Sequence, residues 1–164
     1  MSNTFTVNII SPGKEPFVAE IESLKTVSED GEFEFLANHA AIIISTIPTT
    51  TVIRTGEKRE KFFTSFGIIY FKDNVLKFCC DAFEKASEID PIRAETSKKR
   101  AEERINKGTN IDIERAKRAL ARANARLNTI EGWELTIWNR ILRYEFKCSY
   151  LFTFILEKLS VFHL

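Results

Sequence analysis

Apolar and polar residues alternate in short runs through the first half of the chain. Phe5, Val7 and Ile9 alternate with polar neighbours, and the turn signal at 11–13 then ends the run. Further runs rich in β-forming residues cover 17–22, 32–35, 42–46, 50–54, 60–66, 68–72 and 75–81. Eight or more short strands with no helix between them predict an antiparallel β-sandwich or barrel of about eight to ten strands.

The pattern changes at Asp90, which is a good helix N-cap and precedes a proline suited to the first helical position. Residues 91–106 contain no glycine and no second proline, and a break follows at 107–110. A second helix is predicted over 111–130. Because the link is short, the two helices should form an antiparallel hairpin. The predicted fold class is therefore α+β, with the β-domain first and a C-terminal two-helix hairpin after it.

The second predicted helix has two distinct faces. At about 100° per residue, its apolar stripe consists of Ala116, Ala119, Leu120, Ala123, Leu127 and Ile130. A neighbouring arc carries Arg115, Arg118, Arg122 and Arg126, and the first helix has its own arc of Arg93, Arg100 and Arg104. One interpretation is a solvated face supported by pairs such as Glu114–Arg118. The other is a surface for an anionic partner, either an acidic protein surface or a nucleotide phosphate.

Composition places the chain among globular proteins, since 44% of its 164 residues are apolar and 29% are charged. The net charge of +1 argues against a nucleic-acid partner. It conceals an uneven distribution, however. Residues 1–92 carry 9 basic and 14 acidic side chains, residues 93–126 carry 11 and 5, and residues 127–164 carry 4 and 4. An acidic β-domain thus precedes a basic hairpin.

Several kinds of site are not expected. Cys79 and Cys80 are adjacent and Cys148 is distant, so neither a disulfide framework nor a zinc ribbon is predicted, and a reducing compartment fits. In a strand the two neighbouring thiols should point to opposite faces. Two histidines without clustered ligands predict no metal site. No nucleophile–base pair has a recognisable spacing, so an enzyme is not predicted, and neither a signal peptide nor a spanning helix is indicated.

Short motifs occur in one order along residues 4–130. The run E-D-G-E-F-E-F-L-A-N-H-A at 29–40 resembles G-E-x-G-I-L-P-x-H-A, and S-F-G at 65–67 resembles S-G-G. Residues 81–84 with 88–90 resemble D-T-A-E followed by E-I-D, and the start of the second helix at 111–116 matches as well. These are motifs of the epsilon subunit of F-type ATP synthases, so the chain resembles that family. Departures at Glu34, Ala37, Ala41 and Phe66 put loop geometry in question.

The resemblance implies three regions. Residues 1–88 would form a β-sandwich domain that binds the gamma subunit and the c-ring, and 89–130 a regulatory helical hairpin. Glu32 would face the polar loops of the c-ring and His39 would lie near gamma. From residue type alone, Glu32 is an ordinary turn carboxylate and His39 a capping or packing histidine. The resemblance ends before the aromatic-rich extension 131–164 and implies no role for it.

The implied function is that of a non-catalytic rotor subunit of the central stalk, at the cytoplasmic face of a bacterial membrane. It would couple c-ring rotation, driven by protons or sodium ions, to ATP synthesis, and associate with the membrane only through the complex. When the hairpin extends, its basic face (Arg115, Arg118, Arg122 and Arg126) would contact acidic loops of the beta subunits and inhibit ATP hydrolysis. When the hairpin is folded against the sandwich, it would leave ATP hydrolysis uninhibited.

No cofactor is required by this interpretation, but ATP is a possible regulatory ligand. The segment 89–94 fits the family's I/L-D-x-x-R-A nucleotide motif through Ile89, Asp90, Arg93 and Ala94. The resemblance adds Glu84, Arg100, Arg122 and Arg126 as further contacts. The same motif also serves simply to begin a helix, and no Walker A loop is present, so ATP would not be a substrate. The alternative function is a stand-alone ATP-sensing module built on the arginine-rich hairpin.

The extension beyond the hairpin allows several interpretations. The second helix is able to continue to about residue 144, since Leu135, Trp138 and Leu142 keep a helical spacing. The remainder is an aromatic segment that packs on a partner, a helix at a membrane surface, or a sequence that is not native coding.

Overall fold

A computed structural model describes residues 3–107 and 112–130. Ten strands come first in this part of the chain. They are β1 (Phe5–Ile10), β2 (Phe17–Ile21), β3 (Ser23–Ser28), β4 (Gly31–Leu36), β5 (Ile42–Thr46), β6 (Thr49–Thr55), β7 (Lys58–Thr64), β8 (Gly67–Lys72), β9 (Val75–Cys80) and β10 (Phe83–Lys85). A short 3-10 helix η1 (Ala86–Glu88), α1 (Pro91–Lys107) and a second helix over 113–130 follow. The predicted α+β fold, with the β-domain first, is confirmed.

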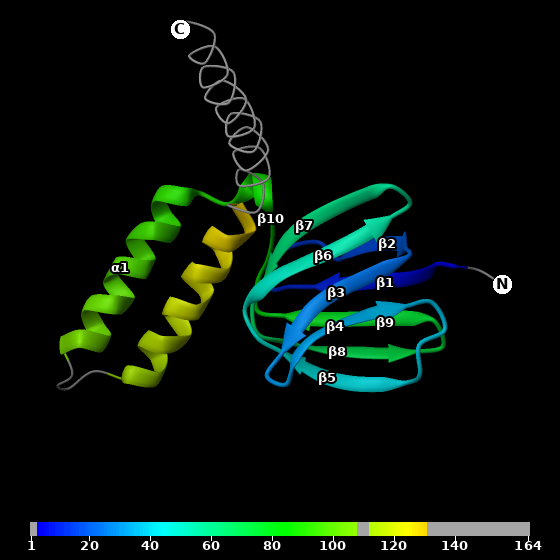
Figure 1. The fold of residues 1–164 in the computed structure, drawn as a ribbon, viewed down its shortest axis with the longest axis horizontal. Coiled ribbons are helices and arrows are strands. Elements are labelled where there is room, and N and C mark those ends of the chain that lie inside the picture. Colours follow the sequence, from blue (N-terminus) through cyan, green and yellow to red (C-terminus); the bar gives the residue numbers. More distant parts are fainter. Residues whose placement is uncertain (1–2, 108–111, 131–164) are drawn as a thin grey trace, which may run out of the picture. The chain divides into compact units, whose positions relative to one another are not determined.

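The strands form two five-stranded sheets (Figure 1), with the orders β2-β1-β9-β8-β5 and β10-β7-β6-β3-β4. The sandwich is confirmed, but one detail differs from the antiparallel prediction: β1 pairs with β9 in parallel, from Thr6–Val75 to Ile10–Cys79. Parallel neighbours need a long connection, and residues 11–74 provide it. Local turn signals do not encode such a pairing, because it depends on how the whole sandwich closes.

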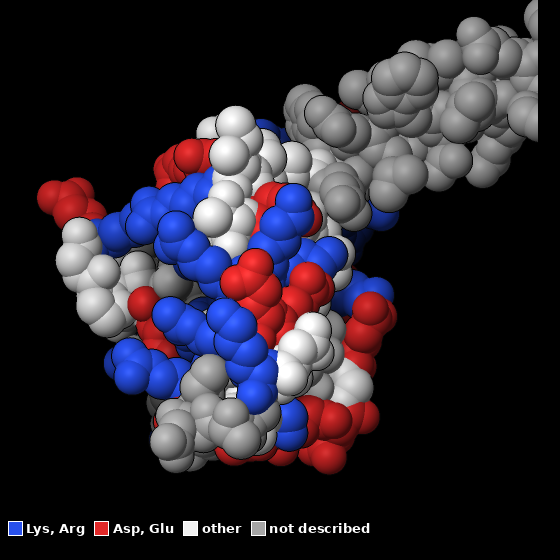
Figure 2. Space-filling view, turned by 90° about the vertical axis from the view of Figure 1, so that its left-hand side faces the viewer, with Lys and Arg blue, Asp and Glu red and all other residues white. Residues whose placement is uncertain are grey.

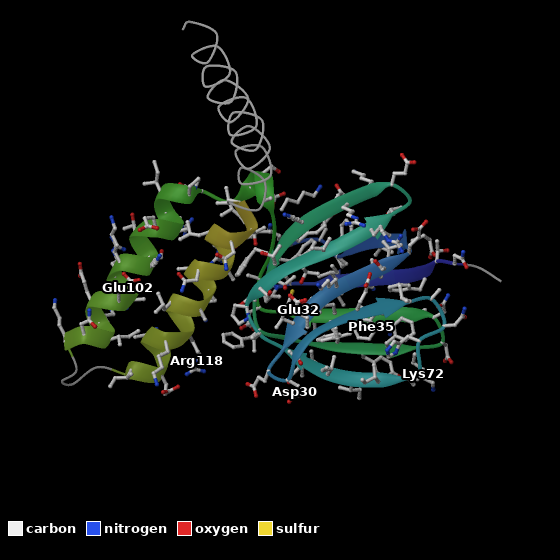
Figure 3. The ribbon with its side chains drawn as sticks, viewed as in Figure 1. Asp30, Glu32, Phe35, Lys72, Glu102 and Arg118 are labelled. Atoms are coloured by element: carbon white, nitrogen blue, oxygen red, sulfur yellow. The ribbon has the colours of Figure 1, made fainter. Side chains whose placement is uncertain are left out.

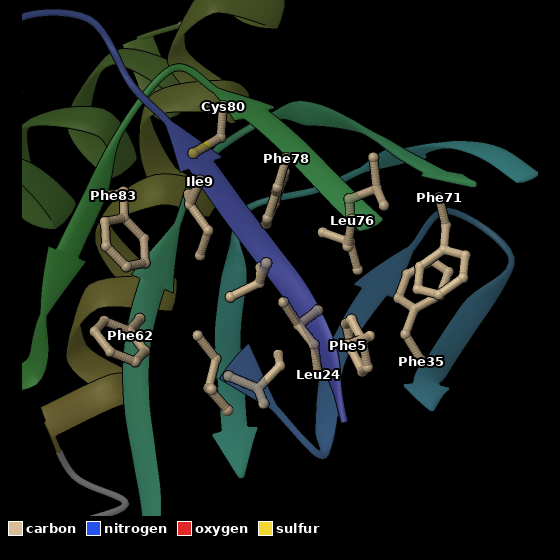
Figure 4. Close-up of a cluster of buried hydrophobic side chains, with 14 residues drawn as sticks. Phe5, Ile9, Leu24, Phe35, Phe62, Phe71, Leu76, Phe78, Cys80 and Phe83 are labelled. Carbon is tan, nitrogen blue, oxygen red and sulfur yellow. The ribbon is translucent and has the colours of Figure 1, made fainter. Parts of the chain in front are cut away.

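The two sheets enclose an aromatic core (Figure 4). Phe5, Val7 and Ile9 are fully buried, which confirms the inward face predicted from the alternation in this strand. Phe35 stacks on Phe71 with ring centroids 5.6 Å apart, and these rings come from different sheets. Burying side chains of this size supplies most of the free energy of folding in a sandwich. The core therefore makes the β-domain a rigid support for the two C-terminal helices.

The side chains of the two cysteines at the end of β9 point to opposite faces of the strand. Cys80 is buried and belongs to the core, whereas Cys79 is exposed. The predicted opposite orientation is confirmed. Cys148 and the predicted extension of the second helix beyond 130 lie outside the described residues.

An aspartate caps the start of each helix, and the cap at Asp90 is the one predicted from the sequence. Asp90 Oδ1 accepts hydrogen bonds from the backbone N–H groups of Ile92 (2.9 Å) and Arg93 (3.1 Å), and Pro91 is the first residue of α1. Asp112 caps the second helix in the same way, accepting from the N–H of Arg115 at 2.9 Å. Each cap satisfies amides that have no partner within their own helix. The second helix thus begins at 113, after its cap.

Candidate functional site

Small residues let the two helices of the hairpin pack closely. Ala94 and Ala101 are buried on α1, and Ala116 and Ala123 are buried on the second helix. Ala116 and Ala123 belong to the apolar stripe predicted for the second helix, and their burial confirms that this face is turned inward. Since alanine loses no side-chain entropy in a helix and adds little bulk, the stripe leaves room for the helices to pack side by side while Arg115 and Arg118 stay exposed.

A small apolar cluster, here called the interface cluster, joins the hairpin to the sandwich. It consists of buried Phe63 on β7, Ile89 and Ala125, with Ala82 and Ile130 packed against it. Beside it the hydroxyls of Thr50 and Thr129 are 2.8 Å apart. Thr129 donates its own hydrogen to the carbonyl of Ala125, so Thr50 donates to Thr129.

Arg126 ties the second helix to the sandwich at the same place. Its Nη2 and Nε donate to the two carboxylate oxygens of Glu84 on β10, at 2.7 and 3.0 Å. Its guanidinium also lies over the ring of Phe63, 4.2 Å from the centroid. A planar fork that meets a carboxylate with two bonds is the strong form of ion pair. The family resemblance indicates both Arg126 and Glu84 as site residues, but it does not indicate that they pair.

A pocket of about 480 Å³ lies between the hairpin and the sandwich. That volume is in the usual range for small-molecule sites, roughly 300–1,000 Å³. The predicted nucleotide contacts that line it are Glu84, Ile89, Asp90, Arg93, Ala94, Arg122 and Arg126. Arg100 is not among the lining residues. The structure thus brings together residues that are up to 42 positions apart in the chain.

Two charged residues of this pocket, Lys14 and Glu88, were not predicted from the sequence. Lys14 Nζ is 3.0 Å from Glu88 Oε2, which ties the β1–β2 loop to η1. The hydrogen bond from Lys14 lowers the pKa of the Glu88 carboxyl. No local signal could have identified Lys14, because its partner is 74 residues away.

The outer faces of the hairpin are basic. Figure 2 shows Lys and Arg side chains gathering on this side of the molecule, with acidic ones between them. Arg93, Arg100, Arg104, Arg115 and Arg118 are exposed, and within 3–107 and 112–130 none of them forms an ion pair. The suggested pair Glu114–Arg118 is not formed, because Glu114 bonds to Lys117 at 3.0 Å instead. Arg118 projects from the second helix without a carboxylate partner in the described ranges (Figure 3).

Glu32 lies on β4 (Figure 3), where its carboxylate is 2.6 Å from Lys25 of the neighbouring strand β3. The hydrogen bond with Glu32 raises the pKa of Lys25. Both side chains are largely exposed, so this pair leaves Glu32 accessible at the surface.

His39 lies beside the aromatic core in an exposed position. Its ring meets Phe35 and Phe71 edge-on, with centroids 5.1 and 5.7 Å apart, and its Nδ1 is 2.8 Å from the carbonyl oxygen of Ala40. The imidazole thus makes the packing contacts expected from residue type alone. Because the residue is exposed, it also stays available to a partner.

Comparisons with known proteins match both parts of the chain. Residues 4–86 match the family described as ATP synthase, Delta/Epsilon chain, beta-sandwich domain, and residues 87–131 match the long alpha-helix domain of the same chain. An ATP synthase epsilon chain of Clostridium novyi (strain NT) is 41% identical over 131 residues, which are 79% of this chain and the whole of that relative. The chain belongs to the ATP synthase epsilon chain family. This membership confirms the resemblance and the prediction of a non-catalytic subunit.

Further relatives and solved structures also belong to ATP synthases. An epsilon chain of Clostridium kluyveri is 38% identical and is matched over its full length by 80% of this chain. Among solved structures, Euglena gracilis mitochondrial ATP synthase (OSCP/F1/c-ring) contains a chain with a TM-score of 0.66 and 15% identity, over 76% of this chain and 80% of that one. The central stalk/c-ring of Tetrahymena thermophila mitochondrial ATP synthase gives 0.50 and 13%, over 76% and 95%. At these identities the likeness concerns the fold.

Two kinds of feature are absent from the described residues. Within them, no group of three or more His, Cys, Asp or Glu side chains is arranged to hold a metal ion. No helix in that part of the chain is both long and apolar enough to cross a membrane.

Proposed function

We propose that this chain is a central-stalk rotor subunit of an F-type ATP synthase, which couples c-ring rotation to ATP synthesis and restrains ATP hydrolysis through its hairpin. Membership of the epsilon chain family supports the assignment to the synthase. The likeness to chains in structures named for F1/c-ring and central stalk supports the place in the complex. Its partners would be gamma, the c-ring and the beta subunits, and it would reach the cytoplasmic face of the membrane through them.

The observation that carries the inhibitory part is the exposed portion of the hairpin's basic face. Arg115 and Arg118 are exposed guanidiniums without an ion pair in the described ranges, on a segment with a net charge of +6. Such a face attracts an acidic protein surface and would form bidentate contacts with its carboxylates. Meanwhile the hairpin is held to its own sandwich by few side chains, chiefly those of the interface cluster and Arg126. A small attachment of this kind is compatible with release.

On the sandwich, Glu32 and His39 remain the proposed contacts of the c-ring and gamma. Glu32 lies on β4, which is an edge strand of its sheet, and its charge is exposed. Exposed polar groups suit the polar loops of a ring, whereas the aromatic surroundings of His39 suit a packed protein interface.

The test is ATP hydrolysis by a reconstituted complex that contains the wild-type chain, a chain lacking 91–164, or the double variant Arg115→Gln/Arg118→Gln. We expect both changes to raise the hydrolysis rate while binding to gamma is unchanged. The matched control is Lys77→Gln, because Lys77 is exposed on β9, away from the hairpin pocket. Unchanged hydrolysis with the chain lacking 91–164 would refute the inhibitory role.

A regulatory ATP site in the pocket is a second proposal, favoured by the seven predicted contacts that line it. Calorimetry with ATP on the wild-type chain, Arg93→Ala and Arg122→Ala tests it, and we expect both variants to bind more weakly. No binding heat with the wild type would refute the site but not the rotor role. Family membership favours a site that acts within the complex over a stand-alone sensor.

A further inference from the structure

The cations that line the hairpin pocket are not equally available to a ligand. There are four: Lys14, Arg93, Arg122 and Arg126. Arg126 already has two hydrogen bonds to Glu84 and a position over an aromatic ring. Arg93 and Arg122 have no ion pair within the described ranges. The pocket therefore contains two uncompensated guanidiniums, which favour an anionic ligand.

The three carboxylates of the pocket also differ in how firmly each is already bonded within the protein. Glu84 is paired with Arg126, and Asp90 uses Oδ1 to cap the start of α1. Glu88 bonds to Lys14 at 3.0 Å and more weakly, at 3.4 Å, to the backbone N–H of Lys85. The Lys14–Glu88 pair is thus the charged contact of the pocket that a ligand can exchange at least cost.

Solvent exposure explains why the Lys14–Glu88 pair is easier to separate than the Arg126–Glu84 pair. The side chains of Lys14 and Glu88 are each about half exposed (47% and 48%), whereas those of Arg126 and Glu84 are 26% and 24% exposed. Exposed single-point pairs contribute little free energy because water screens them. A partly buried bidentate pair whose guanidinium also lies over an aromatic ring is much harder to separate.

We infer that Lys14 is a phosphate-binding residue of this pocket: it leaves Glu88 for a phosphate oxygen, beside Arg93 and Arg122, while Arg126 stays on Glu84. The inference rests on the proposed ATP site and deepens it. The long flexible stem of lysine and its three donors allow the exchange without movement of the backbone. The phosphate chain would then contact the sandwich through Lys14 and both helices through the arginines, and so hold the hairpin in place.

Calorimetry on the full chain tests this, with ATP and inorganic tripolyphosphate as the two probes at one low salt concentration. Lys14→Gln should weaken the binding of both probes about three- to tenfold. Lys14→Arg should restore most of the affinity, because the positive charge and donors are kept. Lys77→Gln is the control for the loss of one surface charge, and its affinity should equal that of the wild type.

The reciprocal change is Glu88→Gln, which removes the competing charge while keeping an oxygen acceptor. It should tighten binding about two- to fivefold. In the Lys14→Gln background this gain should be smaller, because part of it comes from the release of Lys14. An equal gain in both backgrounds would show general charge repulsion instead and would overturn the inference.

The outcomes separate the two proposals. If the wild type binds ATP and Lys14→Gln binds it equally well, the role of Lys14 is refuted and the ATP site stands. If the wild type binds tripolyphosphate but not ATP, the nucleotide site fails while the phosphate-binding cations remain. If the wild type binds neither probe, both proposals fail.

Discussion

Arg126 offers the sharpest test of how the hairpin is held to the sandwich. In Arg126→Gln the bidentate pair with Glu84 and the contact over Phe63 are both lost. A charge-assisted bidentate pair in this partly buried position contributes about 1.5–2 kcal/mol. The cation–π contact adds about 0.5–1 kcal/mol. The attachment should therefore weaken by about 2–3 kcal/mol, which is about a thirty- to 150-fold change in the docking equilibrium.

The assay is thiol labelling of Thr129→Cys, because Thr129 is fully buried at this contact. When reclosing is fast, the labelling rate is proportional to the undocked fraction. Cys79 and Cys148 are replaced by serine, so that the buried Cys80 reports on the sandwich itself. We expect Arg126→Gln to accelerate labelling at 129 about thirty- to 150-fold and to leave labelling at Cys80 unchanged.

The matched control is Glu60→Gln, which breaks the exposed pair with Lys58. Its labelling rate at position 129 should equal that of the parent, since exposed pairs contribute little. If Arg126→Gln also labels at the parent rate, Arg126 does not hold the hairpin and the reasoning is wrong.

Other expectations concern the sandwich and the Lys14–Glu88 pair beside it. A Cβ added at Gly67 would lie 2.5 Å from the carbonyl oxygen of Cys79, so Gly67→Ala should cost about 1–3 kcal/mol in urea unfolding, and an unchanged midpoint would contradict this. Burial raises the pKa of Cys80 to about 12, so at about pH 8 iodoacetamide should label exposed Cys79 and spare Cys80 until the chain unfolds. The hydrogen bond from Lys14 lowers the pKa of Glu88, so its stabilising effect is present above the ordinary value of 4.5 and is lost as the pH falls through the lowered pKa. Urea unfolding should show the stability difference between wild type and Glu88→Gln shrinking from about pH 6 to about pH 3, and a constant difference would count against the tie.

Much of the fold could be predicted because its signals are local. Alternation identified the strands, since residues two apart lie on the same face. Asp90 marked the start of the first helix, because a side-chain oxygen there satisfies amides two and three residues ahead. The alanine stripe of the second helix followed from the helical period alone.

The rest depended on contacts between distant residues. The parallel pairing of β1 with β9 and the ion pair of Lys14 with Glu88 arise only when the sandwich closes. Glu84 and Arg126 were selected through the resemblance, yet their mutual pairing needed the positions of both elements. On the second helix, the period placed Arg118 within reach of Glu114, but Lys117 on the preceding position formed the bond.

The central claim is that the hairpin must leave the sandwich to inhibit hydrolysis. The double variant Thr50→Cys/Thr129→Cys tests it, because the two hydroxyl oxygens lie 2.8 Å apart and a disulfide there would keep the hairpin docked. In the Cys79→Ser/Cys148→Ser background, the same reconstituted complex is assayed oxidised and reduced. The account predicts that oxidation raises ATP hydrolysis to the rate found without 91–164 and that reduction restores inhibition. Equal inhibition in both states would contradict it.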